Sequence, residues 1–369
     1  MSIPVEVIPA NDTVALQEKL KLALEGKICV FISEREINGV KAEVIDLPEV
    51  VENTALIIES SGSTGTPKKI SLSKEALVAA AAASSSVIGS GQWLLALPAN
   101  YIAGAMVLVR SILNGTRPII MNTGVSFTPQ AFALSSTLMT DENRYVSLVP
   151  TQLLRLQDAC ETDKFLLSQL RKFDAILVGG QAVSHKVIES FKAEGVNVVA
   201  SFGMAETAGG CVYDGKALPG VALRINPEGT VAISGPMLAN GVADETGFLN
   251  TQDLGVIDGG LLTVLGRSDR VIISGGIKIS LDQVEDTALA IGGVVDVAAT
   301  AIDSPEWGQR VGLVYVGSPE VADYLAGIAL EQLGPAAKPV RVIRVDRIPK
   351  LASGKNDLLT LKKFFEGVA

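Results

Sequence analysis

Residues 60–69 read SSGSTGTPKK, and they decide how the rest of the chain is interpreted. They follow the apolar run ALIIE at 55–59, whose composition is typical of a buried strand. The ten residues contain two glycines, five hydroxyl side chains and two lysines. Glycines let backbone N–H groups approach a ligand, and hydroxyl and ammonium groups donate to anions. The segment predicts an anion-binding loop, with a polar surface turn before a helix as the alternative.

Two common phosphate-binding motifs do not describe this loop. GxxxxGK[ST] needs a second glycine five residues after the first, but Pro67 and Ile70 stand at that distance from Gly62 and Gly65. The pattern GxGxxG does not occur in the chain. The anion must therefore be identified from the other segments.

Strand-like and helical segments alternate from residue 54 to about residue 200. The strand-like runs are 54–60, 93–98, 117–121, 144–149, 174–179 and 196–201. The helical segments are 73–86, 101–113, 151–159 and 184–193. This alternation predicts an α/β fold in which helices cover mainly parallel sheets, with ligands at the carboxyl ends of the strands.

The pattern changes after about residue 210. Short strand-like pieces separated by Gly, Pro and Asp predict a small antiparallel β region, and a helix, apolar strands and a final helix follow. We expect a large N-terminal domain at 1–266, a hinge at 267–269 that includes Asp269, and a smaller mobile α+β domain at 270–369.

Composition excludes several classes of function. The net charge of −9 argues against nucleic-acid binding, which needs a surplus of Lys and Arg. One histidine and three dispersed cysteines cannot build a zinc cluster, and such sparse cysteine is typical of the reducing cytoplasm. No signal peptide is expected at the N-terminus. Residues 76–109 carry no charge, but their serines, glycines and Pro98 favour a buried helix, a turn and a buried strand over membrane insertion.

Three further segments carry candidate binding residues. In ASFGMAETAGG at 200–210, Glu206 could bind Mg²⁺ and Phe202 could pack on a flat ring. Asp253 and Arg267 suit sugar hydroxyls, because one accepts and the other donates hydrogen bonds. In PKLASGKND at 349–357, Lys355 follows a glycine. The alternatives are ordinary loops with solvated charges.

Taken in order, these motifs resemble those of the adenylate-forming superfamily, which comprises acyl-CoA synthetases, luciferases and peptide-synthetase adenylation domains. The resemblance extends over about 300 residues and rests on segments 60–68, 202–206, 252–253, 266–279 and 349–355. Within this superfamily, the chain most resembles the actinobacterial branch of the o-succinylbenzoate–CoA ligases of menaquinone biosynthesis. This closer resemblance rests on segments 94–115, 178–183 and 203–221.

The resemblance implies an enzyme that joins a carboxylic acid to coenzyme A through an acyl adenylate, using ATP and Mg²⁺. Lys355, Thr64 and Glu206 are the implied catalytic residues, with Thr64 and Glu206 also holding the metal. The implied nucleotide and cofactor contacts are Ser61, Gly62, Ser63, Thr64, Gly65, Lys68, Gly179, Gly180, Gln181, Phe202, Gly203, Met204, Thr207, Asp253, Arg267 and Lys278. The implied acid contacts are Tyr101, Arg110 and Ser201.

Other interpretations stay open from the sequence. The acceptor could be a carrier-protein thiol, the acid could be another aromatic acid, and a non-catalytic nucleotide binder is a third class. Arg110 could instead be a surface arginine at a helix end. The sequence departs from the superfamily pattern at Gln252, at Phe202 in place of Tyr, at Asn100–Tyr101 and at Asn356–Asp357. Self-association into a homo-oligomer is also left open.

Overall fold

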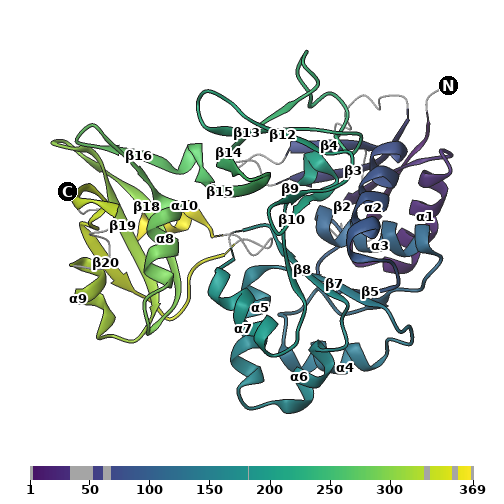
Figure 1. The fold of residues 1–369 in the computed structure, drawn as a ribbon, viewed down its shortest axis with the longest axis horizontal. Coiled ribbons are helices and arrows are strands. Elements are labelled where there is room, and N and C mark those ends of the chain that lie inside the picture. Colours follow the sequence, from purple (N-terminus) through teal and green to yellow (C-terminus); the bar gives the residue numbers. More distant parts are fainter. Residues whose placement is uncertain are drawn as a thin grey trace. The chain divides into compact units, whose positions relative to one another are not determined.

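A computed structural model of the chain describes residues 3–33, 53–60, 68–181, 183–327, 333–350 and 356–366. Figure 1 shows the fold and labels most of its helices and strands. The chain forms two units. The core unit comprises Met1–Arg224, Ala232–Asn250 and Gly259–Leu262, and the C-terminal unit comprises Ile225–Val231, Thr251–Asp258 and Thr263–Ala369. A hinge at 267–269 stays a prediction.

The first sheet of the core unit carries the two ends of the glycine-rich loop. Its strands are β1 (Val5–Pro9), β2 (Cys29–Ser33), β3 (Thr54–Ser60) and β4 (Lys68–Ser73), in that spatial order. β1, β2 and β3 are parallel, whereas β4 is antiparallel to β3 and pairs Lys68 with Ser60. The loop therefore joins two paired strands, and the helix that was expected to follow it begins only after β4.

The second sheet of the core unit has seven strands in the order β11-β10-β9-β8-β7-β5-β6. They are β5 (Gln92–Leu95), β6 (Ile119–Ile120), β7 (Arg144–Leu148), β8 (Ala175–Gly179), β9 (Val198–Met204), β10 (Gly209–Tyr213) and β11 (Lys216–Ala217). The pairs from β6 to β9 are parallel, and β10 is antiparallel to both β9 and β11. The mainly parallel α/β fold is confirmed.

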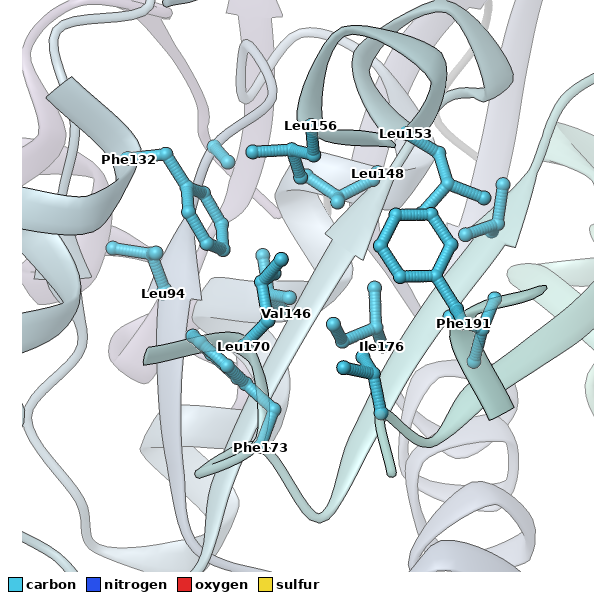
Figure 2. Close-up of a cluster of buried hydrophobic side chains, with 14 of the residues drawn as sticks. Leu94, Phe132, Val146, Leu148, Leu153, Leu156, Leu170, Phe173, Ile176 and Phe191 are labelled. Atoms are coloured by element: carbon cyan, nitrogen blue, oxygen red, sulfur yellow. The ribbon is translucent and has the colours of Figure 1, made fainter. Parts of the chain in front are cut away.

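One face of this sheet packs on the helices α4 (Pro129–Thr137), α5 (Pro150–Cys160), α6 (Lys164–Leu170) and α7 (His185–Ala193). Figure 2 shows the resulting cluster of buried side chains, in which the Phe132 and Phe173 rings stack with centroids 5.6 Å apart. Val146 and Ile176 project into it from β7 and β8. Because alternate residues of a strand face opposite ways, the intervening residues face the other side.

That other side packs on α2 (Lys74–Ile88) and α3 (Ile102–Asn114), and α1 (Thr13–Leu24) packs against α3 and the first sheet. α2 is capped by Ser73, whose hydroxyl accepts a hydrogen bond from Ala76 N at 3.0 Å. α3 ends at Gly115 in the left-handed conformation. The uncharged segment 76–109 thus contains the buried helix and the buried strand that were expected there, and its last residues belong to α3, which agrees with the helical segment predicted at 101–113.

The third sheet contains β12 (Ala222–Ile225), β13 (Thr230–Ser234), β14 (Leu249–Asp258) and β15 (Leu261–Arg267) in sequence order, and its residues are divided between the two units. This sheet is the small β region that the sequence predicts after residue 210.

The rest of the C-terminal unit is an α+β structure, as predicted. Its sheet has the order β17-β16-β19-β18, with β20 beside β19. The elements are β16 (Val271–Ser274), β17 (Ile277–Ser280), α8 (Leu281–Leu289), β18 (Val294–Ser304), β19 (Gly308–Gly317), α9 (Val321–Ala326), β20 (Arg341–Arg344) and α10 (Leu358–Lys363). Val284 of α8 is fully buried in its core, with Val311, Leu313 and Tyr315 of β19.

Within the described ranges, no helix combines the length and the hydropathy that a bilayer-spanning segment requires.

Candidate nucleotide and acid site

Glycines allow a close approach of the backbone at the carboxyl ends of β8 and β9 and at the start of β10. Gly179 stands opposite Ser201 in the sheet, and a Cβ atom at Gly179 would lie 2.4 Å from the Ser201 carbonyl oxygen. A Cβ atom at Gly203 would lie 2.1 Å from the Gly209 carbonyl oxygen. Only glycine permits either approach. These strand ends have the position at which parallel α/β sheets bind ligands.

A short turn after β9 presents Glu206. The Thr207 hydroxyl is fully buried; it accepts a hydrogen bond from Met204 N at 2.9 Å and donates one to the Gly209 carbonyl oxygen at 2.7 Å. The Glu206 carbonyl oxygen accepts from Ala239 N at 2.8 Å. Thr207 therefore shapes the turn from within, and its direct contact with a nucleotide stays a prediction.

The Glu206 side chain is half-buried and has no hydrogen-bond or ion-pair partner among the residues that the structure describes. Its carboxylate is thus available to a ligand. A single free carboxylate suits Mg²⁺, which binds one or two carboxylates together with phosphate oxygens. In the same described ranges, no group of three or more His, Cys, Asp or Glu side chains gathers into a site built by the protein alone.

Phe202, Met204 and Gln181 are half-exposed near this turn and the end of β8, and Gly180 is exposed with φ +87°. They come from the two strand ends at which nucleotide contacts are expected. Their contacts with a nucleotide stay predictions.

Arg110 is buried in α3, with 3% of its surface exposed, so the alternative of a surface arginine is wrong. Its guanidinium carbon lies 4.8 Å from the centre of the Trp93 ring of β5. Its Nε atom has no hydrogen-bond partner, and no carboxylate within the described part of the chain pairs with it. Burial lowers the pKa of the guanidinium, and nearby Tyr213 opposes that shift.

Two aromatic residues that the sequence reasoning missed define the surroundings of Arg110. Trp93 is buried, and its Nε1 atom has no hydrogen-bond partner in the part of the chain that the structure describes. The Tyr213 hydroxyl of β10 hydrogen-bonds the Ser84 hydroxyl of α2 at 2.8 Å. Strand alternation could have placed Trp93 on the α2 and α3 face, since Leu94 belongs to the opposite cluster.

Arg110 continues a stripe along α3. Ile102, Met106 and Arg110 are spaced four residues apart, which places them on one face of the helix. A Cβ atom at Gly209 would lie 3.7 Å from Met106 Cγ and 3.8 Å from Ile102 Cγ1. The stripe therefore faces the glycine-rich part of the sheet, and Tyr101 directly precedes it as the N-cap of α3.

A cavity of about 10 Å³ lies nearby between α2 and β10, next to Ala80, Gly210 and Cys211. It is large enough for one water molecule only. It cannot hold an organic acid.

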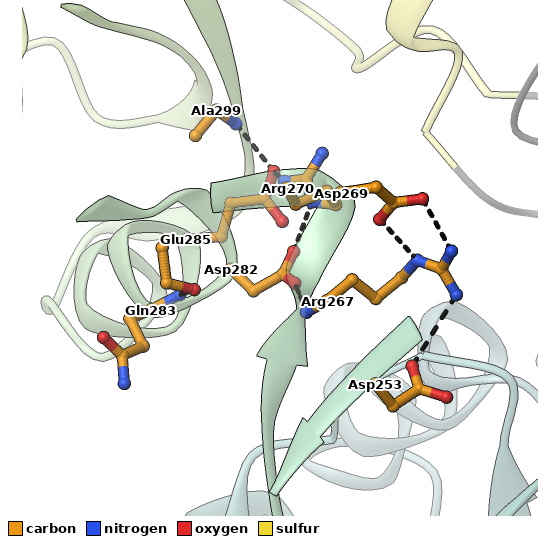
Figure 3. A network of polar contacts seen from close by, with 9 residues as sticks. Asp253, Arg267, Asp269, Arg270, Asp282, Gln283, Glu285 and Ala299 are labelled. Carbon is orange, nitrogen blue, oxygen red and sulfur yellow. Dashed lines mark hydrogen bonds and ion pairs between the residues drawn. The ribbon is translucent and has the colours of Figure 1, made fainter. Parts of the chain in front are cut away.

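Asp253 and Arg267, both expected to bind ribose, lie together in the C-terminal unit (Figure 3). Arg267 Nη1 is 3.7 Å from Asp253 Oδ1. The other donors of Arg267 contact Asp269, with Nε at 2.9 Å and Nη2 at 2.6 Å from its carboxylate oxygens. The hydrogen bond to Asp269 is the main cause that raises the pKa of Arg267.

The unusual Gln252 also has a partner in this region. The Ser268 hydroxyl donates to Gln252 Oε1 at 2.8 Å. Gln252 thus links β14 to the segment after β15, a contact that a glycine at this position could not make.

The remaining predicted residues divide into two groups. Lys68 is the exposed first residue of β4, and Lys278 is exposed in β17. Outside the described residues lie Ser61, Gly62, Ser63, Thr64, Gly65 and Lys355.

Comparison with known proteins agrees with these features. Residues 7–244 match the AMP-binding enzyme family, and residues 283–355 match the AMP-binding enzyme C-terminal domain. A probable 2-succinylbenzoate–CoA ligase of Mycobacterium tuberculosis is 35% identical over 337 residues, which cover 87% of each chain. The 2-succinylbenzoate–CoA ligase of Lactococcus lactis is 26% identical over 334 residues, covering 84% of this chain and 70% of that protein.

Solved structures share the fold. The o-succinylbenzoate CoA synthetase of Bacillus subtilis, in complex with its acyl-adenylate intermediate, superposes with a TM-score of 0.76 at 22% identity, covering 98% of this chain and 88% of that one. ATP-bound MatB of Rhodopseudomonas palustris superposes with a TM-score of 0.78 at 19% identity, covering 100% and 90%. By the match of residues 7–244 and the 35% identity to the Mycobacterium tuberculosis protein, the chain belongs to the AMP-binding enzyme family.

Proposed function

We propose that the protein is an AMP-forming acid–thiol ligase that converts 2-succinylbenzoate to its CoA thioester in menaquinone biosynthesis. In the first step, one carboxylate of the acid attacks the α-phosphorus of ATP and pyrophosphate leaves. In the second, the CoA thiol attacks the acyl adenylate and AMP leaves. The names of two relatives, at 35% and 26% identity, support this substrate.

The observation that carries the proposal is the buried Arg110, which pairs with no carboxylate among the residues that the structure describes. A charge removed from water without a counter-ion is strongly unfavourable, so a site that retains one is suited to an anionic ligand. 2-Succinylbenzoate has two carboxylates, of which only one reacts with ATP. The second carboxylate would supply the anion that Arg110 lacks.

The stripe on α3 gives a direction for binding. Met106 and Arg110 are buried, so the side chains that cover the stripe would have to move apart to admit the acid. An acid admitted in this way would place its aromatic part against Ile102 and Met106 and its distal carboxylate at Arg110. Its reacting carboxylate would then point toward the carboxyl ends of β8 and β9, near Ser201 and Tyr101. Both residues are proposed as acid contacts.

The nucleotide contacts follow from the family resemblance. The loop residues from Ser61 to Lys68 would bind the β- and γ-phosphates, and Gly179, Gly180 and Phe202 would surround the adenine. Asp253 and Arg267 would bind the ribose. Thr64 and Glu206 would hold Mg²⁺, which would neutralise phosphate charge, and the free Glu206 carboxylate fits that role.

Lys355 would stabilise the charge that develops on the α-phosphate. A carboxylate is a weak nucleophile and repels ATP, so positioning and charge neutralisation supply most of the catalysis. Motion about Asp269 would exchange Lys355 for the CoA-binding face that includes Lys278.

The alternative acceptor is a carrier-protein thiol, and the alternative substrate is another aromatic acid. Three free cysteines, Cys29, Cys160 and Cys211, fit action in the reducing cytoplasm, where ATP and CoA are available.

Pyrophosphate release tests the proposal. The protein would be assayed with 2-succinylbenzoate, benzoate and a series of other aromatic acids, each with and without CoA. We expect release with 2-succinylbenzoate and multiple turnovers only with CoA. Release with benzoate but not with 2-succinylbenzoate would contradict the proposed substrate. Turnover that CoA does not increase would contradict the proposed acceptor.

A further inference from the structure

Asp282, in the first turn of α8, holds two points of the segment that connects β15 to β16. Its Oδ2 atom accepts a hydrogen bond from the backbone N of Arg267 at 2.7 Å. Its Oδ1 atom pairs with Nε of Arg270. Both contacts are drawn in Figure 3. One carboxylate thus fixes the start and the end of a four-residue stretch.

The backbone at Gly266, directly before Arg267, lies so close to this carboxylate that no side chain fits between them. Gly266 has φ +122°, and a Cβ atom there would lie 2.7 Å from Asp282 Oδ2 and 2.9 Å from its Cβ. A side chain at position 266 would displace the carboxylate from Arg267 N. The glycine and the aspartate therefore form one arrangement.

Arg270 has a separate anchor. Its Nη2 atom lies 2.5 Å from Glu285 Oε1, which also accepts from Ala299 N at 2.7 Å. Arg270 can therefore remain attached to α8 through Glu285 when Asp282 is changed. Asp282 is the one side-chain acceptor of Arg267 N among the residues that the structure describes.

We propose that Asp282 is a positioning residue for nucleotide binding, which it serves by fixing the backbone from which the Arg267 side chain extends. This inference rests on the proposed function, in which Arg267 and Asp253 bind the ribose. Asp282 itself touches no nucleotide. It sets where the Arg267 guanidinium lies, between Asp269 on one side and Asp253 on the other.

Two kinds of variant separate this role from a general effect on folding. Asp282→Ala removes both contacts of the carboxylate. Asp282→Asn and Arg270→Gln remove the ion pair but leave an oxygen at position 282 that can accept from Arg267 N. Asp286→Ala is the matched control, because Asp286 is an exposed acid one turn further along α8.

The measurement is AMP binding to the full-length protein by calorimetry, together with the melting temperature. Asp282→Ala should weaken AMP binding about tenfold, the typical effect of losing one charge-assisted hydrogen bond. Asp282→Asn and Arg270→Gln should lower the melting temperature but keep AMP affinity within about threefold of wild type. Asp286→Ala should change neither.

Gly266→Ala gives a second route to the same result should Asp282→Ala fail to fold. Its added methyl group should displace the carboxylate and weaken AMP binding by a similar factor. Wild-type affinity in either Asp282→Ala or Gly266→Ala, or equal weakening by Arg270→Gln and Asp282→Ala, would overturn the inference. Failure of the wild-type protein to bind AMP would instead overturn the proposed function.

Discussion

The Arg110 guanidinium lies over the face of the Trp93 ring, 4.8 Å from its centre, and no carboxylate within the described ranges pairs with it. A cation–π contact recovers only part of the hydration that a buried guanidinium loses. The folded protein therefore retains an unfavourable charge at a position that the proposed substrate would neutralise.

Arg110→Met should make the folded protein more stable and its binding of 2-succinylbenzoate weaker. We expect the free energy of unfolding in urea to rise by about 1 kcal/mol, because an unpaired buried charge is replaced by an apolar side chain of similar length. The KM for 2-succinylbenzoate should rise about 100-fold, since a buried carboxylate would lose its cation.

Arg117→Met is the control for Arg110, because Arg117 is exposed shortly after the same helix. It should leave KM unchanged. An Arg110→Met protein with wild-type KM would show that the second carboxylate binds elsewhere.

Glu206→Gln tests the metal site. The substitution preserves size but removes the charge, so the Mg²⁺ concentration for half-maximal pyrophosphate release should rise about tenfold. Titration of Mg²⁺ at saturating ATP and acid measures it. Glu245→Gln, at an exposed glutamate of the core unit, should behave as wild type. Identical Mg²⁺ dependence in both variants would rule Glu206 out as a metal ligand.

The structure shows which parts of the site could be predicted from the sequence. Strand β3 and helices α2 and α3 follow from apolar runs and a serine N-cap, which are local signals. The burial of Arg110 does not follow, because an arginine near the end of an apolar helix usually extends its charge into water. Trp93 and Tyr213 come from separate strands, and only tertiary packing brings them to Arg110.

The contacts of the predicted hinge are equally non-local. Arg267 and Asp269 are recognisable from the resemblance, but the role of Asp282 depends on where α8 packs. The sequence spacing of Gly266 and Asp282 gives no sign that they touch.

Glu285 should make stability depend on pH. Burial raises its pKa to about 7, although Arg270 and the Ala299 N–H oppose the shift and Asp282 adds to it. Because this folded-state pKa exceeds the unfolded value, the stabilising contribution is full below about pH 4.5 and is lost as pH rises through about 7.

Urea unfolding of wild type and Glu285→Gln between pH 5 and pH 8 measures this effect. The stability of wild type should fall relative to the variant as pH increases, since glutamine does not ionise. Parallel curves for the two proteins would mean that Glu285 titrates equally in the folded and unfolded states.

Lys355→Ala should slow the first half-reaction, adenylate formation, and leave the second, thioester formation, unchanged. Loss of the positive charge should slow adenylate formation about 100-fold or more, because that step develops charge on the α-phosphate. Thioester formation from supplied acyl adenylate should be unaffected. Lys362→Ala, at a lysine of α10, is the control. Equal slowing of both half-reactions would remove the assignment of Lys355 to the first step.

The most direct test of the account is exchange of labelled pyrophosphate into ATP, measured without CoA, because it reports reversible acyl-adenylate formation alone. We expect rapid exchange with 2-succinylbenzoate and little with benzoate. In Arg110→Met, exchange should be slow at 2-succinylbenzoate concentrations near the wild-type KM and should recover as that concentration is raised. Absence of exchange with 2-succinylbenzoate, or equal exchange with both acids, would contradict the account.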